Sequence, residues 1–190
     1  MFNQTYENAP NSQAAKDLSE VGGWLAGGDA PEGLTSFGFE PTALYEVTPR
    51  QRALYRGVIA LILANRPRDF HACKPITRAL LGEGDVDDHH IFPDAHLRTQ
   101  GISDAKRRDC VLNRTLIDRA TNQSLSSRDP KDYFWEMRAR LGAAPFDQLL
   151  DSHLLPSSEQ SPLLASDYRA FLEWRCQRIG RAIKEATGYA

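Results

Sequence analysis

The chain lacks the features that would direct it into or across a membrane. None of its 190 residues belongs to a run of eighteen apolar residues, which excludes a predicted transmembrane helix. The N-terminal segment has no basic stretch followed by an apolar stretch, so it does not resemble a secretion signal. We therefore expect a cytoplasmic protein with no membrane partner.

The sequence contains three cysteines, and their spacing does not suggest that they pair. Cys73, Cys110 and Cys176 are far apart and odd in number, which argues against a disulfide framework and favours a reducing compartment. The absence of a Cys-x-x-Cys pair excludes a cysteine-based zinc knuckle. The sequence also has no G-x-x-x-x-G-K-[ST] loop, so it contains no P-loop for nucleotide phosphates.

An overall excess of positive charge is missing as well. The net charge of −2 does not by itself indicate a nucleic-acid-binding protein. The charges are unevenly distributed, however: residues 1–50 hold seven acidic and two basic residues, and residues 98–140 hold ten basic and six acidic residues. A polyanion could bind this basic segment, and a solvated surface of mixed charge explains it equally well.

The pattern of apolar residues divides the chain near residue 48. Residues 1–48 are rich in Gly, Asn, Pro and Ser, and they predict a loop-rich segment or linker with one short helix around Ala14–Leu25. Residues 49–190 hold apolar residues at helical spacing, which predicts a mainly helical domain. Three helix starts are predicted where an N-cap residue precedes a proline: Thr48-Pro49, Asp129-Pro130 and Ser161-Pro162.

One segment in the middle of the chain has a different pattern. Short apolar runs at Val86–Phe92 and Cys110–Ile117 predict two strands joined by a polar loop. Asp118 is placed to cap a short helix over Ala120–Leu125. The fold class we expect is therefore mainly α with a small ββα insert at about residues 85–127, an α+β arrangement.

The first predicted strand ends in a cluster of acids and histidines, GDVDDHHIFPDAHL. Of the adjacent pair His89 and His90, one can bind a metal while the other stays free as a base, a division of labour that phosphodiester hydrolysis requires. One histidine is a poor metal site, but the amide oxygen of Asn122 on the following helix is a hard ligand suited to Mg²⁺ or Mn²⁺. Asn113 could tie the backbone of the loop and hold the preceding histidine.

Four short motifs make this pattern more specific: D-D-H-H-I-F-P, L-N-R-T-L-I, A-T-N-Q-S-L-S and P-K-D-Y-F. They resemble the HNH nuclease domain at the C-terminus of GmrSD-type modification-dependent (type IV) restriction endonucleases, which reads (D/E/H)-H-I-F-P, N-x-x-L, N-x-x-I and P-x-x-Y. Leu125 stands where that pattern has Ile. The nine positions from Asn113 to Asn122 equal the separation of the corresponding residues in HNH nucleases. The resemblance covers about residues 85–135.

The resemblance implies a role for each matched residue. His90 corresponds to the general base, and His89 and Asn122 correspond to the two metal ligands. Asn113 corresponds to the residue that braces the loop and orients the base. One divalent ion is implied, Mg²⁺ or Mn²⁺ with Zn²⁺ or Ni²⁺ as alternatives, and the products would carry a 5′-phosphate and a 3′-hydroxyl.

Several nearby residues remain candidates with two interpretations. Asp88 is a candidate to orient one of the histidines, although Asp87 and Asp88 could both be solvated turn residues. Arg114 and Arg119 flank the predicted site and are candidates for binding the scissile phosphate. His96 is close in sequence, but a surface or helix-packing role explains it better.

The resemblance implies a metal-dependent DNA endonuclease that nicks or cuts duplex DNA, in restriction and anti-phage defence. Its relatives usually carry an N-terminal nucleotide-hydrolysing domain with a ParB-like fold, so a longer protein could contain this chain. One alternative is a non-cleaving nucleic-acid-binding module that keeps the ββα core. Another is a helical interaction domain with a fortuitous histidine loop, which would make the spacing a coincidence.

Overall fold

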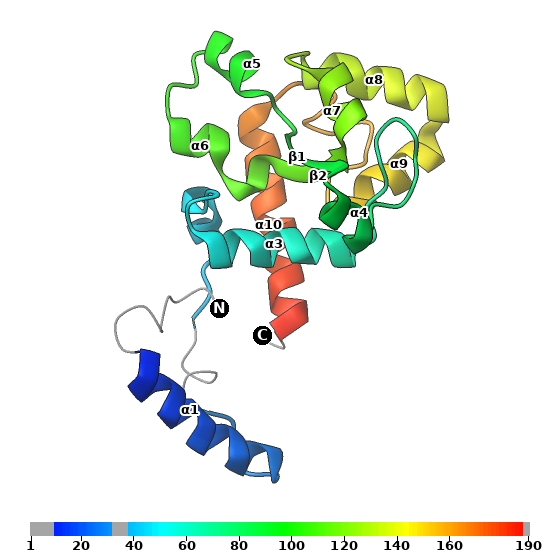
Figure 1. The fold of residues 1–190 in the computed structure, drawn as a ribbon. Coiled ribbons are helices and arrows are strands. Elements are labelled where there is room, and N and C mark those ends of the chain that lie inside the picture. Colours follow the sequence, from blue (N-terminus) through cyan, green and yellow to red (C-terminus); the bar gives the residue numbers. More distant parts are fainter. Residues whose placement is uncertain (1–9, 32–37, 188–190) are drawn as a thin grey trace. The chain divides into compact units, whose positions relative to one another are not determined.

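The computed structural model describes residues 10–31 and 38–187. The chain forms two compact units, Met1–Glu40 and Pro41–Ala190. The described part of the first unit contains helix α1, Pro10–Leu25, which is longer than the helix predicted around Ala14–Leu25 (Figure 1). The second unit contains every residue of the predicted site.

The second unit is mainly helical, with one two-stranded antiparallel sheet in its described part. This arrangement confirms the expected α+β class. Its elements are η1 (Pro41–Glu46), α3 (Arg52–Ala64), α4 (Arg78–Glu83), β1 (Val86–His90), α5 (Asp94–Thr99), α6 (Ala105–Asp109), η2 (Val111–Asn113), β2 (Arg114–Asp118), α7 (Arg119–Leu125), α8 (Pro130–Leu141), α9 (Ala143–Ser152) and α10 (Tyr168–Thr187).

The long helix α10 forms the centre of this unit and packs against η1, η2 and α3. Its apolar stripe, which includes Phe171 and Ile179, is fully buried. Gly180 lets the chain approach closely at Pro41, since a Cβ at Gly180 would lie 2.9 Å from the Pro41 side chain. Leu44 on η1 is fully buried as well. This packing explains why the compact unit begins at Pro41 rather than at residue 49.

The three predicted helix starts have different outcomes. Asp129 caps α8 as expected, because its carboxylate accepts a hydrogen bond from the Lys131 N–H. At the first site, Thr48 donates two hydrogen bonds to Gln51 in a turn, and α3 begins only at Arg52. The start predicted at Ser161-Pro162 is wrong: those residues form turns, and α10 begins at Tyr168.

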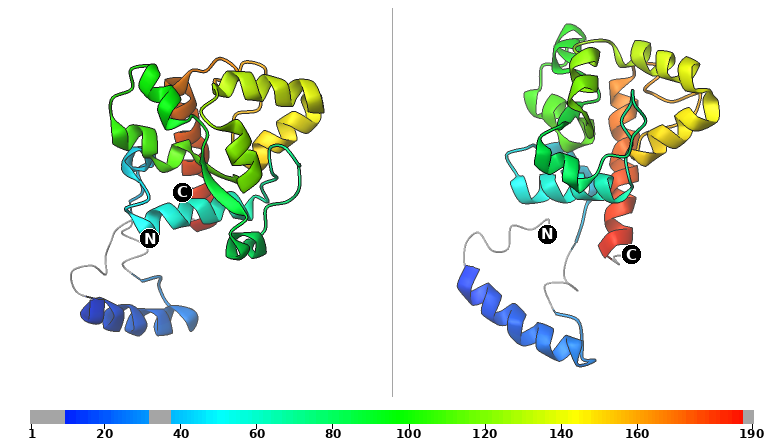
Figure 2. Two further views of the ribbon diagram at one scale, coloured as in Figure 1. Left: turned by 45° about the horizontal axis from the view of Figure 1, so that its top comes forward. Right: turned by 45° about the vertical axis from the view of Figure 1, so that its right-hand side comes forward.

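The segment from β1 to α7 forms the predicted strand–strand–helix sequence. β1 pairs with β2 in a register that places Val86 opposite Asp118 and His90 opposite Arg114. Asp118 caps α7 as expected, accepting from the N–H groups of Ala120 and Thr121. The connection between the strands, predicted as a polar loop, contains α5 and α6. The hairpin lies between α3 and α7 (Figures 1 and 2), and both helices contact it.

All three cysteines are free thiols, in agreement with the predicted lack of a disulfide framework. Burial raises the pKa of the Cys110 thiol to about 11, so this group is an uncharged part of the core. Within residues 10–31 and 38–187, no helix combines the length and apolar character needed to span a membrane.

Candidate functional site

The two faces of β1 carry two different clusters of polar side chains. Side chains alternate along a strand, so Asp87 and His89 face one side while Asp88 and His90 face the other. The first pair lies against α7, where His89 meets Asn122. The second pair lies on the side of α3 and of the connection between the strands. His89 and His90 are therefore adjacent in sequence but have separate environments.

His89 and Asn122 meet although they are 33 residues apart in the sequence. The His89 Nδ1 atom lies 2.7 Å from the Asn122 Oδ1 atom. Two neighbouring ligands of an octahedral ion, with bonds of ~2.1 Å, are separated by a similar distance, about 3.0 Å. The pair therefore fits a divalent ion, which would replace the ring proton that they share.

Asp87 fixes the orientation of the Asn122 amide. Its Oδ2 atom accepts a hydrogen bond of 2.9 Å from Asn122 Nδ2, which turns the amide oxygen toward His89. Arg119 holds the same carboxylate from the solvent side, with its Nε atom 3.4 Å from Asp87 Oδ1. An outer carboxylate that orients a ligand is a recurrent feature of metal sites. The sequence offered Asp88 as a candidate for orienting one of the histidines, and the carboxylate that orients the Asn122 amide is that of Asp87.

The environment of His89 keeps its imidazole neutral. The residue is 2% exposed, and burial lowers its pKa to about 4. The rings of Phe70 and Tyr133 contact it edge-on, with centroids 6.1 Å and 6.4 Å from the His89 ring. The Nε2 atom has no hydrogen-bond partner among the described residues. A neutral, fixed imidazole is the form that binds metals.

The number of ligands limits which kind of metal site this can be. In the part of the chain that the structure describes, no three His, Cys, Asp or Glu side chains gather around one point that could hold an ion. A structural zinc site requires four such ligands. Mg²⁺ keeps several of its water molecules and commonly binds through one or two protein groups. The donor set thus fits an ion that is shared with water and substrate oxygens.

Asn113 is the most deeply embedded polar residue of the site. Its side chain is fully buried, and its Oδ1 atom accepts a hydrogen bond of 2.8 Å from the Phe92 N–H. Its Nδ2 atom donates to the carbonyl oxygens of Phe92 and Arg108, at 2.9 Å and 2.8 Å. The backbone of Asn113 also accepts from the Ile91 N–H at 3.0 Å. These bonds fix the turn that follows His90, the bracing role expected for this residue.

His90 lies at the end of β1, and about a quarter of its side chain is exposed. Its Nε2 atom is 3.2 Å from Asp109 Oδ1. When Nε2–H donates to this carboxylate, the Nδ1 atom keeps its lone pair and can accept a proton. Burial is the main cause that lowers the pKa of His90 below 6.5, so the ring is neutral at pH 7. Asp109 was missed in the sequence, where it appeared only as an acid in a polar loop.

Arg114 has internal partners and is almost fully buried. Its guanidinium forms ion pairs with Asp109 and with Asp88, the latter at 3.6 Å. Asp88 also accepts a hydrogen bond from the Tyr55 hydroxyl. Neither Arg114 nor Asp88 is placed as the sequence suggested: Arg114 supports Asp109, and Asp88 contacts Tyr55. Arg119 is half-exposed and remains accessible to a phosphate.

The other described histidines lie outside this cluster. His153 is fully buried and spans from Thr115 Oγ1 at 2.7 Å to the Arg68 carbonyl at 2.6 Å. His96 lies on α5, and its Nε2 atom is 3.9 Å from Asp129, so it has the packing role that the sequence suggested. His71 is exposed in the loop before α4.

Comparison with known proteins shows one informative similarity and assigns no activity to the chain. No family model matches the chain. No solved structure matches it. A curated protein of Methanocaldococcus jannaschii, named uncharacterized protein MJ0686, is 34% identical over 142 residues. The aligned region covers 72% of this chain and 23% of that protein, so the chain spans less than a quarter of its relative's length.

Proposed function

We propose that this chain is a metal-dependent DNA endonuclease of the HNH type. The main support is the convergence at one end of the hairpin. His89 Nδ1 and Asn122 Oδ1 lie 2.7 Å apart, and His90 is the next residue, at the end of β1 before the turn that Asn113 braces. These are the four residues to which the motif resemblance assigns the metal ligands, the base and the brace.

A divalent ion at His89 and Asn122 would stabilise negative charge on the scissile phosphate. The hard amide oxygen of Asn122 suits Mg²⁺ or Mn²⁺, and Zn²⁺ or Ni²⁺, which imidazole binds well, are alternatives. Asp87 would keep the Asn122 oxygen directed at the ion through its 2.9 Å hydrogen bond. Arg119, next to Asp87, is the candidate for a direct contact with phosphate.

His90 would act as the general base. Asp109 holds its Nε2–H, which leaves Nδ1 to take a proton from the attacking water. The water oxygen then bonds to phosphorus as the bond from phosphorus to the 3′-oxygen breaks. The leaving 3′-oxygen takes a proton from solvent water, so the products carry a 5′-phosphate and a 3′-hydroxyl. General base catalysis contributes roughly 10²–10⁴-fold to such rates. Asn113 keeps the base in place through the turn at Phe92.

The biological setting is part of the same proposal. Resemblance to GmrSD-type enzymes supports a role in restriction of modified or phage DNA in the cytoplasm. The aligned region is 23% of the M. jannaschii relative, which is compatible with a nuclease domain that works beside other domains. A ParB-like nucleotide-hydrolysing domain of the same protein is the partner that the resemblance suggests.

Nicking of supercoiled plasmid tests this function. The protein is freed of metal with EDTA and then supplied with Mg²⁺ or Mn²⁺. We expect nicking only with metal, and we expect His89→Ala and Asn122→Ala to raise the metal concentration needed for half-maximal rate. Plasmid that is bound but never nicked, across all four candidate metals, would contradict the proposal and support the non-cleaving module instead.

A further inference from the structure

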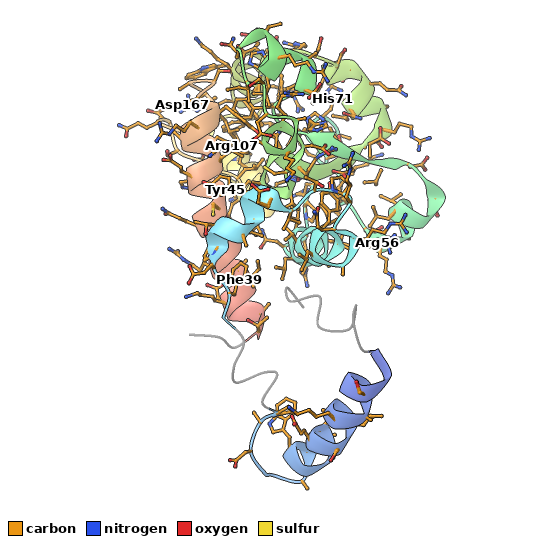
Figure 3. The ribbon with its side chains drawn as sticks, turned by 90° about the vertical axis from the view of Figure 1, so that its left-hand side faces the viewer. Phe39, Tyr45, Arg56, His71, Arg107 and Asp167 are labelled. Atoms are coloured by element: carbon orange, nitrogen blue, oxygen red, sulfur yellow. The ribbon has the colours of Figure 1, made fainter. Side chains whose placement is uncertain are left out.

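A groove separates α3 from the face of the hairpin that carries His90. It has a volume of about 270 Å³. Arg52, Tyr55 and Arg56 line it from α3, and Asp88 and Leu116 line it from the hairpin. Figure 3 labels Arg56 on α3, where its side chain is exposed to solvent.

The groove lies directly beside the proposed catalytic base. Asp88 and Leu116 are opposite each other in the hairpin register, and Asp88 is two residues before His90 on the same face of β1. Two residues of a strand span about 7 Å. A chain of phosphates that passes His90 can therefore continue into the groove without leaving the surface.

The arginines at this end of α3 have no internal role that explains their charge. Arg50, Arg52 and Arg56 are exposed, and none has an ion-pair partner among the residues that the structure describes. The first turn of α3 has no acidic residue. Cations near a helix N-terminus oppose the helix dipole, and like charges four residues apart repel each other. Charges placed at such a cost to the helix are available for an external anion.

The acidic residue of the groove has partners within the protein. Asp88 forms an ion pair with Arg114 at 3.6 Å and accepts a hydrogen bond from the Tyr55 hydroxyl. Arg114 also pairs with Asp109, so these three groups together carry one negative charge. The two arginines on the other wall leave the groove with a net positive charge.

We propose that this groove binds the sugar-phosphate backbone of duplex DNA beside the cleaved bond, with Arg52 and Arg56 contacting phosphates. The inference rests on the proposed endonuclease function, and it adds the path of the substrate. The two arginines bind DNA without reading its sequence, since contacts to phosphate position the duplex and carry no base information. They act on the affinity for DNA and leave the chemical step unchanged.

Salt-dependent DNA binding tests the groove independently of cleavage. Binding of a labelled 30-base-pair duplex is followed by fluorescence anisotropy at several salt concentrations. The association constant K falls as salt rises, and each lost phosphate contact makes the slope of log K against log salt shallower by about 0.9. Arg52→Gln/Arg56→Gln should therefore make this slope shallower by about 1.8. If the two proteins bind DNA equally at 1 M salt, this difference in slope makes the affinity of the variant roughly 30-fold weaker than that of the unmodified protein at 0.15 M salt. Arg52→Lys/Arg56→Lys should restore most of the slope.

A matched control removes the same amount of charge elsewhere. Arg181 and Lys184 are exposed near the C-terminal end of α10, and neither lines the groove. Arg181→Gln/Lys184→Gln should leave the slope unchanged. If the salt slope becomes equally shallow in this control, the groove inference is wrong, because the change would indicate only a general effect of net charge.

Plasmid nicking by the same proteins separates the two proposals. In the groove variant, we expect KM to rise at least tenfold while kcat changes less than threefold. If the unmodified protein nicks DNA and the groove variant keeps its slope and KM, the groove inference is wrong and the endonuclease proposal stands. If the unmodified protein never nicks, the proposed function fails, and the slope still shows whether duplex DNA occupies the groove.

Discussion

Replacement of Asn113 by alanine is the perturbation whose effect follows most directly from the geometry. The side chain is fully buried and makes three hydrogen bonds, one to the Phe92 N–H and two to the carbonyl oxygens of Phe92 and Arg108. Alanine removes all three bonds and leaves three backbone groups without partners. The turn after His90 and the end of α6 would lose the side chain that joins them.

The expected cost is large for one residue. A buried polar group left without its partner costs about 1–3 kcal/mol. Water entering the space left by the amide can satisfy part of this loss, because the site is polar. We therefore expect Asn113→Ala to reduce the free energy of unfolding by about 3–5 kcal/mol. Domains are commonly stable by only about 5–15 kcal/mol, so this variant would approach the limit of folding.

Urea unfolding followed by circular dichroism measures this effect. Asn122→Ala is the matched control, because its half-exposed amide contacts side chains only, His89 and Asp87. The control strands one buried group, His89 Nδ1, instead of three, and should lose less, about 1–3 kcal/mol. A decrease in the free energy of unfolding below about 1 kcal/mol for Asn113→Ala, with an unchanged slope of this free energy against urea concentration, would refute the idea that Asn113 holds the turn.

Three further predictions follow from the contacts of the site. Burial lowers the pKa values of His89 and His153 from 6.5 to about 4, so the unfolded chain binds protons that the folded chain excludes. The metal-free protein should therefore lose stability as pH falls from 6.5 toward 4, by up to ~1.4 kcal/mol per pH unit for each histidine. His153→Gln should halve this slope in urea titrations, and an unchanged slope would exclude His153 as a source. Asp87→Ala should weaken Mn²⁺ binding by roughly 10–100-fold in a paramagnetic resonance titration, because the Asn122 amide loses its orienting acceptor; unchanged affinity would contradict that role. Asp109→Asn should lower kcat of nicking by roughly tenfold or more and leave KM unchanged, and a change in KM alone would place Asp109 in DNA binding.

The part of the fold with strong local signals was predictable from the sequence. The order strand, strand, helix in the ββα segment follows from two short apolar runs and from an N-cap aspartate. Asp118 and Asp129 both cap helices as expected. Such caps act within one turn of the chain, so the sequence alone specifies them.

Contacts that depend on the packing of distant segments were not predictable. The Asp109 contact with His90 spans 19 residues, and it depends on α6, which was predicted as a polar loop. Whether Asp87 or Asp88 orients the Asn122 amide depends on which face of β1 is covered by α7. Alternation along a strand assigns the two aspartates to opposite faces but does not say which face meets the helix.

The boundaries of the helical unit illustrate the same limit. Ser161-Pro162 has the pattern of a helix start, but the Ser161 hydroxyl donates to the Pro156 carbonyl and holds a series of turns instead. Asp167 is the residue that accepts from the first turn of α10, at the Ala170 N–H. At the other end, Pro41 belongs to the unit because Gly180 allows it to pack closely on α10.

The central claim is that His90 is the base of a metal-dependent nuclease, and a comparison of two histidine variants tests it most directly. His90→Ala and His71→Ala are assayed for plasmid nicking in Mn²⁺ under single-turnover conditions; His71 is the control because it is exposed and lies outside the site. We predict a loss of at least ~10²-fold for His90→Ala, with its fold and DNA affinity intact, and an unchanged rate for His71→Ala. Equal rates for the two variants would contradict the account.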